Sequence, residues 1–192
     1  AAGGGKVMMV QPWLRNAEEI ADLAKDSLIT FRVVTCMNEA GEPEVTLAML
    51  RLLAKLEPAW RNLADEEYAA PIDLSTGRLG PVRGDDFHTV PIHMAVHPAT
   101  GAAVEGRVLA GWPALRDVAL KAHAAFPHRV VIGWDIALTP QGPVVLEGNS
   151  NFDVMFLQRV HMQPLGLTRL GDLMRFHMAD HGSLPLSSAS AT

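Results

Sequence analysis

The chain has 192 residues, of which 48% are hydrophobic and 19% are charged, and its formal net charge is −5. This length suits one domain with a sizeable core, or one large lobe of a bigger domain, and no apolar run approaches the length of a membrane span. The net negative charge argues against a nucleic-acid-binding surface, and the single cysteine, Cys36, is compatible with a reducing cytosol, so we expect a cytoplasmic protein.

The first residues predict a flexible lead-in, a strand and a helix. Residues 1–6, AAGGGK, lack the glycine spacing and the following Ser or Thr of a phosphate-binding P-loop. An apolar strand is predicted over residues 7–14, VMMVQPWL. Residues 16–27 predict a helix with Asn16 as its N-cap and acidic residues in its first turn.

Two apolar runs, residues 28–37 (LITFRVVTCM) and 44–53 (EVTLAMLRLL), predict a pair of strands. Arg32 interrupts the first run. A guanidinium among apolar neighbours needs an anionic partner, and an ion pair with a nearby Asp or Glu is the simplest explanation on general grounds. Cys36 lies in the same run, which predicts buried packing rather than nucleophilic chemistry.

The middle of the chain contains three histidines whose spacing does not favour a metal site. Residues 71–81, PIDLSTGRLGP, predict a strand and a turn. His88, His93 and His97 follow at spacings of five and four, which do not fit one strand face, and Pro91 breaks any helix that would put them on one helix face. We therefore expect ordinary strand and turn histidines, and a zinc hydrolase is the weaker alternative.

A clear helix is predicted over residues 111–127, with Pro113 in its first turn and apolar residues on one face. Two further helices are predicted over residues 152–162 and 168–182, the last one ending at Gly182. A disordered tail, residues 183–192, is expected to follow.

Residues 130–151 predict a hairpin that places acidic side chains together. Thr139-Pro140-Gln141-Gly142 is typical of a three-residue hairpin loop with a bulge at Gly142. If Thr139 faces Pro143, then Asp135 lies opposite Glu147. One predicted face holds Asp135, Ala137, Val145, Glu147 and Asn149. The other face, expected to be core, holds Trp134, Ile136, Leu138, Val144 and Leu146.

Two carboxylates facing each other across a sheet destabilise it unless something neutralises them. A divalent metal does so, and carboxylate and amide oxygens suit Mg²⁺ rather than Zn²⁺. Neutralising Asp135 or Glu147 by substitution is then expected to relieve the repulsion. A solvated acidic face is the alternative explanation of the same pattern.

Five blocks of the sequence together resemble the sugar-transfer-associated ATP-grasp family. They are VQPWLRN, LITFRVVT, AAPIDLSTGRLG, HPATG and GWDIALTPQGPVVLEGNSN, in family order from about Val7 to Gln158. The resemblance implies an α+β fold, mostly antiparallel sheet with flanking helices, similar to the C-terminal lobe of the ATP-grasp fold. It would cover residues 7–182 as a single domain.

The resemblance also implies a site for ATP and Mg²⁺. It assigns Mg²⁺ to Asp135, Glu147 and Asn149. It makes Arg32 a catalytic residue that faces the phosphates, in place of the structural ion pair. The adenine pocket would be formed by Gln11, Pro12, Trp13 and Leu14. A core strand that ends at Pro12 is the other explanation of this last segment.

The implied activity uses MgATP to convert a small-molecule carboxylate into an acyl phosphate, which an amine or another nucleophile then attacks. The family name implies a setting in polysaccharide or cell-envelope synthesis. The chain departs from the family at Asp65-Glu66-Glu67, where relatives have a glycine-rich turn and where three acids would repel an anionic ligand. ATP-grasp sites close between two lobes, so we expect an N-terminal lobe from elsewhere, in a longer chain or a partner. A non-catalytic binding module is the alternative function.

Overall fold

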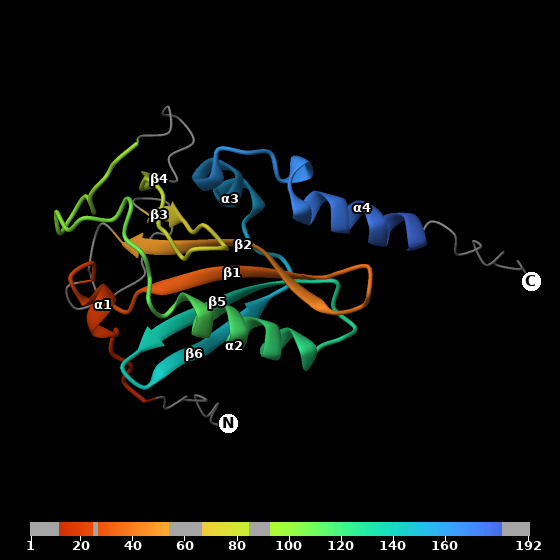
Figure 1. Ribbon diagram of the computed structural model, residues 1–192, viewed down its shortest axis with the longest axis horizontal. Coiled ribbons are helices and arrows are strands. Elements are labelled where there is room, and N and C mark those ends of the chain that lie inside the picture. Colours follow the sequence, from red (N-terminus) through yellow and green to blue (C-terminus); the bar gives the residue numbers. More distant parts are fainter. Residues whose placement is uncertain (1–11, 25–26, 54–66, 85–92, 182–192) are drawn as a thin grey trace, which may run out of the picture.

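A computed structural model describes residues 12–24, 27–53, 67–84 and 93–181 and has an antiparallel sheet at its centre (Figure 1). Its strand order is β4-β3-β2-β1-β5-β6. The strands are β1 (Thr30–Met37), β2 (Pro43–Leu53), β3 (Glu67–Pro71), β4 (Arg83–Gly84), β5 (Val131–Thr139) and β6 (Gly142–Asn149). The helices are α1 (Glu18–Ala21), α2 (Trp112–Ala124), α3 (Val154–His161) and α4 (Arg169–His181), with a 3-10 turn at Leu165–Leu167. The α+β class predicted from the sequence is confirmed.

Each face of the sheet carries a hydrophobic core, because the apolar side chains of β1 point alternately to two clusters. Phe31 and Val33 belong to the first core, which α1 and α2 cover through Ile20 and Leu115. These two helices lie on the opposite side of the sheet from α3 and α4 (Figure 1). Hydrophobic burial on this face therefore fixes α2 against the central strands.

The second core lies on the other face of the sheet, under α3 and α4. Val34 and Cys36 of β1 contribute to it together with Leu157 of α3 and Leu173 of α4. Cys36 is fully buried, as predicted, and burial raises the pKa of its thiol to about 11. A thiol with this pKa stays protonated at neutral pH, so Cys36 packs as a small apolar side chain.

The helix predicted over residues 16–27 is wrong in length and in its cap. The structure has only the short α1, whose N-cap is Ala17. Asn16 instead donates from Nδ2 to the Ser27 carbonyl (2.7 Å) and accepts at Oδ1 from the Ile29 amide (2.9 Å). Its side chain therefore ties the two ends of this segment together instead of starting a helix.

The β5–β6 hairpin has the predicted pairing of Asp135 with Glu147, but its turn and bulge differ from the prediction. Thr139 pairs with Gly142, so the loop has two residues rather than three. The register shifts between Asp135 and Ile136, whose partners are Glu147 and Val145. Leu146 is thus the extra residue of a bulge in mid-strand. This bulge, and not one at Gly142, restores the predicted register of the acids.

The bulge also changes the predicted faces of β6. Val145 packs against the first core, whereas Val144 and Leu146 are 37% and 41% exposed. The prediction that Val144 and Leu146 are core residues is therefore wrong. On β5 the predicted core side chains, Trp134 and Ile136 among them, are buried in the first core as expected.

His97 has a structural role in its turn. Its Nδ1 accepts hydrogen bonds from the Ala99 and Thr100 amides (3.0 and 3.2 Å). The Gly101 amide donates to the His97 carbonyl (2.9 Å), and Gly101 has a φ of 72°, which suits glycine. His93 is paired with Glu105, and His88 lies outside the described residues.

None of the helices in the described part of the chain is long and apolar enough to span a membrane. The predicted lead-in, residues 1–6, and the predicted tail, residues 183–192, lie outside the described residues.

Candidate functional site

A hollow of about 1380 Å³ opens over the face of the sheet that carries Arg32. Its floor comes from β1, β2, β5 and β6, and its walls come from residues 12–16 and 151–153. Arg32 alternates with Phe31 and Val33, so it points away from the first core and toward this hollow. The hollow and the second core therefore share one face of the sheet.

Arg32 and Asp135 form a bidentate ion pair in the floor of the hollow. The two residues face each other across β1 and β5. Arg32 Nε donates to Asp135 Oδ1 (2.7 Å), and Arg32 Nη2 donates to Oδ2 (3.0 Å). Both residues are buried, at 8% and 5% exposed. The ion pair expected for Arg32 on general grounds is thus present, and its partner is the carboxylate predicted to hold the metal.

Arg51 is a second guanidinium in the floor, and it is not among the site residues predicted from the sequence. It lies on β2 opposite Thr30, which places it on the same face as Arg32. Arg51 Nε donates to Glu67 of β3, and its Nη1 contacts Asp135 Oδ2 at 3.4 Å. Burial alone would lower the pKa of Arg51, but the bonds to Glu67 and the charge of Asp135 raise it above its ordinary value.

The signal that could have identified Arg51 was a charged residue within the long apolar run of β2. Glu67 belongs to the acidic stretch predicted to repel an anionic ligand. In the structure its charge is matched by Arg51 instead. Asp65 and Glu66 lie outside the described residues.

Glu147 and Asn149 complete the polar floor on β6. Glu147 is exposed and lies opposite Asp135, and Asn149 Nδ2 donates to Glu147 Oε1 (2.9 Å). The described residues contain no group of three or more His, Cys, Asp or Glu placed to hold a metal. The oxygen donors that meet here are two carboxylates and one amide. This donor set fits Mg²⁺, which binds through one or two carboxylates and keeps water ligands.

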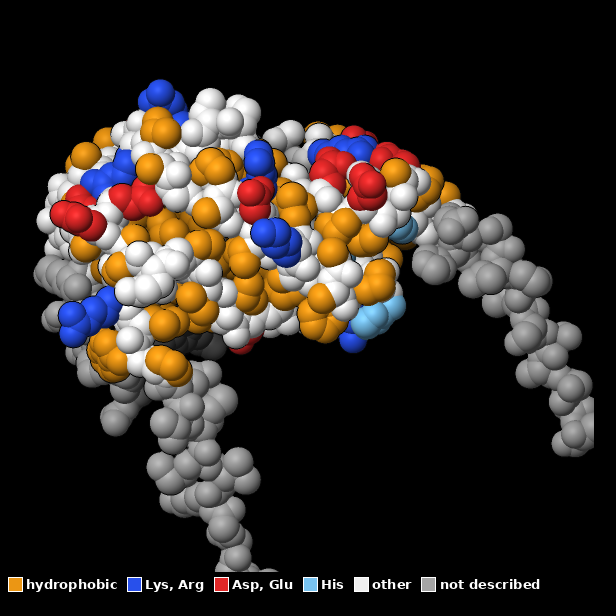
Figure 2. Space-filling view, turned by 60° about the horizontal axis from the view of Figure 1, so that its bottom comes forward, with side chains coloured by type: hydrophobic (Ala, Val, Ile, Leu, Met, Phe, Trp, Pro, Cys, Tyr) orange, Lys and Arg blue, Asp and Glu red, His pale blue; other side chains and the backbone are white. Residues whose placement is uncertain are grey.

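The walls of the hollow carry exposed apolar side chains. Trp13, which is 85% exposed, and Leu14 line it from one side, and Val144 and Leu146 of β6 line it from the hairpin. Figure 2 shows further hydrophobic side chains at the surface between charged groups on the face that it brings forward. The predicted adenine segment thus borders the hollow from Pro12 onward, and Gln11 lies outside the described residues.

The expected repulsion between Asp135 and Glu147 is not the dominant interaction at this site. Two guanidinium groups already neutralise Asp135, so its removal would leave buried positive charge without a partner. Breaking a buried ion pair from one side costs about 3–5 kcal/mol. Asp135→Asn is therefore expected to destabilise the protein, which corrects the sequence-based expectation.

The model of the family described as sugar-transfer associated ATP-grasp matches residues 1–169, a range that contains every residue of the hollow. No curated protein and no solved structure matches the chain.

Proposed function

The chain belongs to the sugar-transfer-associated ATP-grasp family, and from this premise we propose that the hollow binds MgATP and that the protein activates a small-molecule carboxylate for attack by an amine. The observation that carries the proposal is the row of Arg51, Arg32, Asp135 and Glu147 across four neighbouring strands. Cationic and oxygen-donor groups side by side suit a ligand made of a metal ion and a polyanion.

Each part of the hollow has a role in this proposal. Asp135, Glu147 and Asn149 hold Mg²⁺ through their oxygens. Arg32 hydrogen-bonds the phosphate oxygens and offsets the negative charge that they carry. Trp13, beside the apolar side chains of β6, offers an exposed aromatic surface to the base.

The chemistry that MgATP supplies in this family is phosphoryl transfer to a carboxylate. The side chains of this chain orient that ligand, and the buried floor excludes water from one side of it. The family description, sugar-transfer associated, supports a setting in polysaccharide or cell-envelope synthesis. The acid and the amine are small molecules in this proposal.

A non-catalytic binding module is the second candidate function. The observation that favours it is that both arginines of the floor are engaged by carboxylates of the same chain. Such a module would bind MgATP without turnover. Release of ADP and phosphate on addition of a carboxylate and an amine separates the ligase from the module.

The test of the proposed site is a calorimetric titration of the full chain with ATP, with and without Mg²⁺. Glu147→Gln removes one metal ligand that is exposed and has no ion-pair partner in the described part of the chain. We expect it to weaken MgATP binding at least about tenfold, equivalent to ~1.4 kcal/mol, and to leave adenosine binding unchanged.

Glu42→Gln is the matched control, because Glu42 is an exposed glutamate in the turn between β1 and β2, outside the hollow. It should bind MgATP as the natural chain does. Equal MgATP affinity for Glu147→Gln and the natural chain would overturn the metal assignment.

A further inference from the structure

Asp135 is bound on both of its oxygens by arginines of the same chain. Arg32 takes Oδ1 and Oδ2 at 2.7 and 3.0 Å, and Arg51 adds a contact to Oδ2 at 3.4 Å. A divalent cation that uses this carboxylate must therefore share it with guanidinium groups or displace them. This competition rests on the proposed function, which makes Asp135 a metal ligand.

The buried and half-buried charges in and beside the floor already balance one another without a ligand. Arg32 and Arg51 contribute two positive charges, and Asp135 and Glu67 contribute two negative ones. Glu147 is exposed to solvent, which screens its charge. A cation of charge two that enters beside Asp135 therefore leaves an excess of positive charge in a poorly solvated place, which is unfavourable unless an anion follows.

We propose that Arg32 makes metal binding conditional on an anion: a divalent cation gains the Asp135 carboxylate when a phosphate-bearing ligand takes over the hydrogen bonds of Arg32. The phosphate oxygens replace the Asp135 oxygens as acceptors for the guanidinium fork, a geometry that arginine suits. Arg51 remains held by Glu67 and so stays in place while Arg32 changes partner.

The consequence is thermodynamic coupling between the two ligands. Free metal binds weakly because it must break the Arg32–Asp135 pair. The metal and the polyphosphate bind well together, because the metal neutralises Asp135 and the phosphate oxygens neutralise Arg32 once the ion pair between these two residues is broken. By linkage, the gain in affinity is the same whichever ligand arrives first.

The test measures Mn²⁺ binding to the full chain by electron paramagnetic resonance, and binding of the Mn²⁺ complex of a non-hydrolysable ATP analogue by calorimetry. Arg32→Met removes the guanidinium that competes for Asp135. It should tighten the binding of free Mn²⁺ and weaken the binding of the Mn²⁺–nucleotide complex, each by about tenfold. The opposite signs identify the conditional site, because loss of folding would weaken both.

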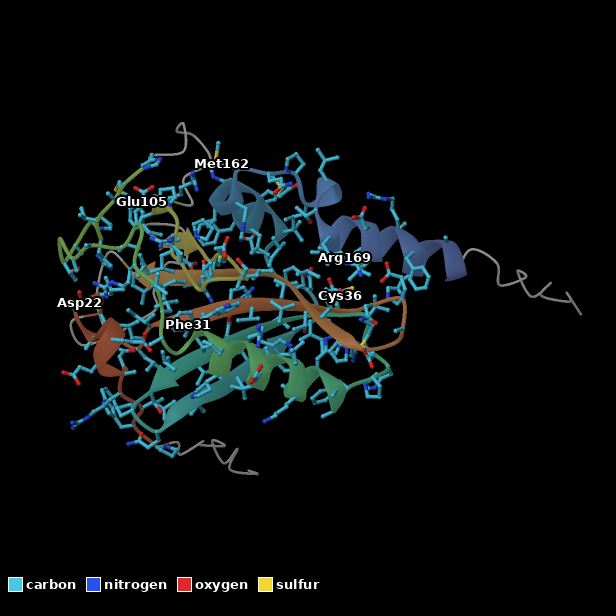
Figure 3. All side chains as sticks on the ribbon, in the orientation of Figure 1. Asp22, Phe31, Cys36, Glu105, Met162 and Arg169 are labelled. Atoms are coloured by element: carbon cyan, nitrogen blue, oxygen red, sulfur yellow. The ribbon has the colours of Figure 1, made fainter. Side chains whose placement is uncertain are left out.

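Arg169→Met is the matched control. Arg169 also pairs with two carboxylates, Glu39 and Glu44, but it starts α4 and lies outside the lining of the hollow. Figure 3 shows it near the Cys36 end of β1, whereas Phe31, the neighbour of Arg32 in the sequence, lies toward the other end. This variant should change neither measurement.

Arg32→Lys covers the case in which Arg32→Met does not fold. Lysine keeps the charge but cannot make the two-pronged bond, so both effects should keep their signs and become smaller. Equal affinity of the natural chain and both Arg32 variants for free Mn²⁺ would overturn the conditional site while leaving the proposed function intact. Failure of every form to bind the Mn²⁺–nucleotide complex would instead overturn the proposed function.

Discussion

His161 shows what burial does to a single titratable side chain. It ends α3, and its Nε2 is buried without a hydrogen-bond partner among the described residues. Burial lowers the pKa of its imidazole from 6.5 to about 4, and the nearby charge of Arg83 acts in the same direction, against a backbone bond to Ala48. His161 is therefore neutral in the folded protein at neutral pH.

This lowered pKa predicts a loss of stability in mild acid. The unfolded imidazole keeps a pKa near 6.5, so below that pH the unfolded chain binds more protons than the folded one. The free energy of unfolding should fall as the pH drops from about 6.5 to about 4, by up to about 3 kcal/mol. Urea unfolding at about pH 7 and about pH 4.5 measures this difference.

His161→Gln should lose less stability over the same pH range, because it removes the titrating group. His128→Gln is the control, since His128 is exposed, and it should keep the pH dependence of the natural chain. If His161→Gln shows the same pH dependence as the natural chain, His161 is not the group responsible.

The sequence predicted which types of residue form the site, but it did not predict which side chains bind one another. The charge of Arg32 in an apolar strand demanded an anion, and the hairpin pattern placed Asp135 opposite Glu147. That Asp135 itself is the partner of Arg32 depends on the pairing of β1 with β5, two segments about a hundred residues apart, which local patterns do not report. Arg51 was missed for the same reason, because it reaches Asp135 from β2 across β1.

At the scale of single elements, the β5–β6 hairpin depends on the absence of a side chain at Gly148. Gly148 lies opposite Trp134, and an added Cβ would lie 2.6 Å from Trp134 Cζ3. Gly148→Ala should therefore force the indole or the strand to move and lower the free energy of unfolding by about 1–3 kcal/mol. Urea unfolding measures this loss.

Gly166→Ala is the control for this substitution, because no atom lies within 4 Å of the Cβ that it adds. Its free energy of unfolding should differ from that of the natural chain by much less than that of Gly148→Ala. Equal stability of the two variants would show that Trp134 adapts without cost, so that Gly148 does not fix the hairpin.

Elements with a strong local pattern were predicted well, and those held by side-chain contacts were not. The spacing of apolar residues and Pro113 located α2, and β-branched runs located β1 and β2. The start of α1 was wrong because Asn16, a good N-cap by type, binds Ser27 and Ile29 instead. These hydrogen bonds depend on the path of the chain after α1, which brings Ser27 and Ile29 next to Asn16.

For the whole molecule, the two cores share one sheet, so we expect them to unfold together. Leu115→Ala empties part of the first core and Leu157→Ala part of the second, and both leucines are fully buried. Each substitution should cost about 2–5 kcal/mol. Tryptophan fluorescence and far-UV circular dichroism should follow one coincident transition in each variant.

Leu167→Ala is the control, because Leu167 is 75% exposed, and it should change stability by less than about 0.5 kcal/mol. Separate transitions for the two probes in either core variant would show that the faces of the sheet unfold independently.

The antiparallel sheet was predictable because consecutive strands form hairpins. Which helix covers which face was not, since β1 is buried on both sides and its run of apolar residues shows no alternation.

The mid-strand bulge brings together two kinds of side chain that a regular strand would place on opposite faces of the sheet. Neighbouring residues of a regular strand point to opposite faces, yet Leu146 and Glu147 both border the hollow. Two consecutive residues thus present an apolar side chain and a carboxylate to the same hollow. Under the proposed function, a substitution at Leu146 would change the preference for one nucleobase over another. The neighbouring carboxylate of Glu147, which is proposed to bind the metal, would keep its position.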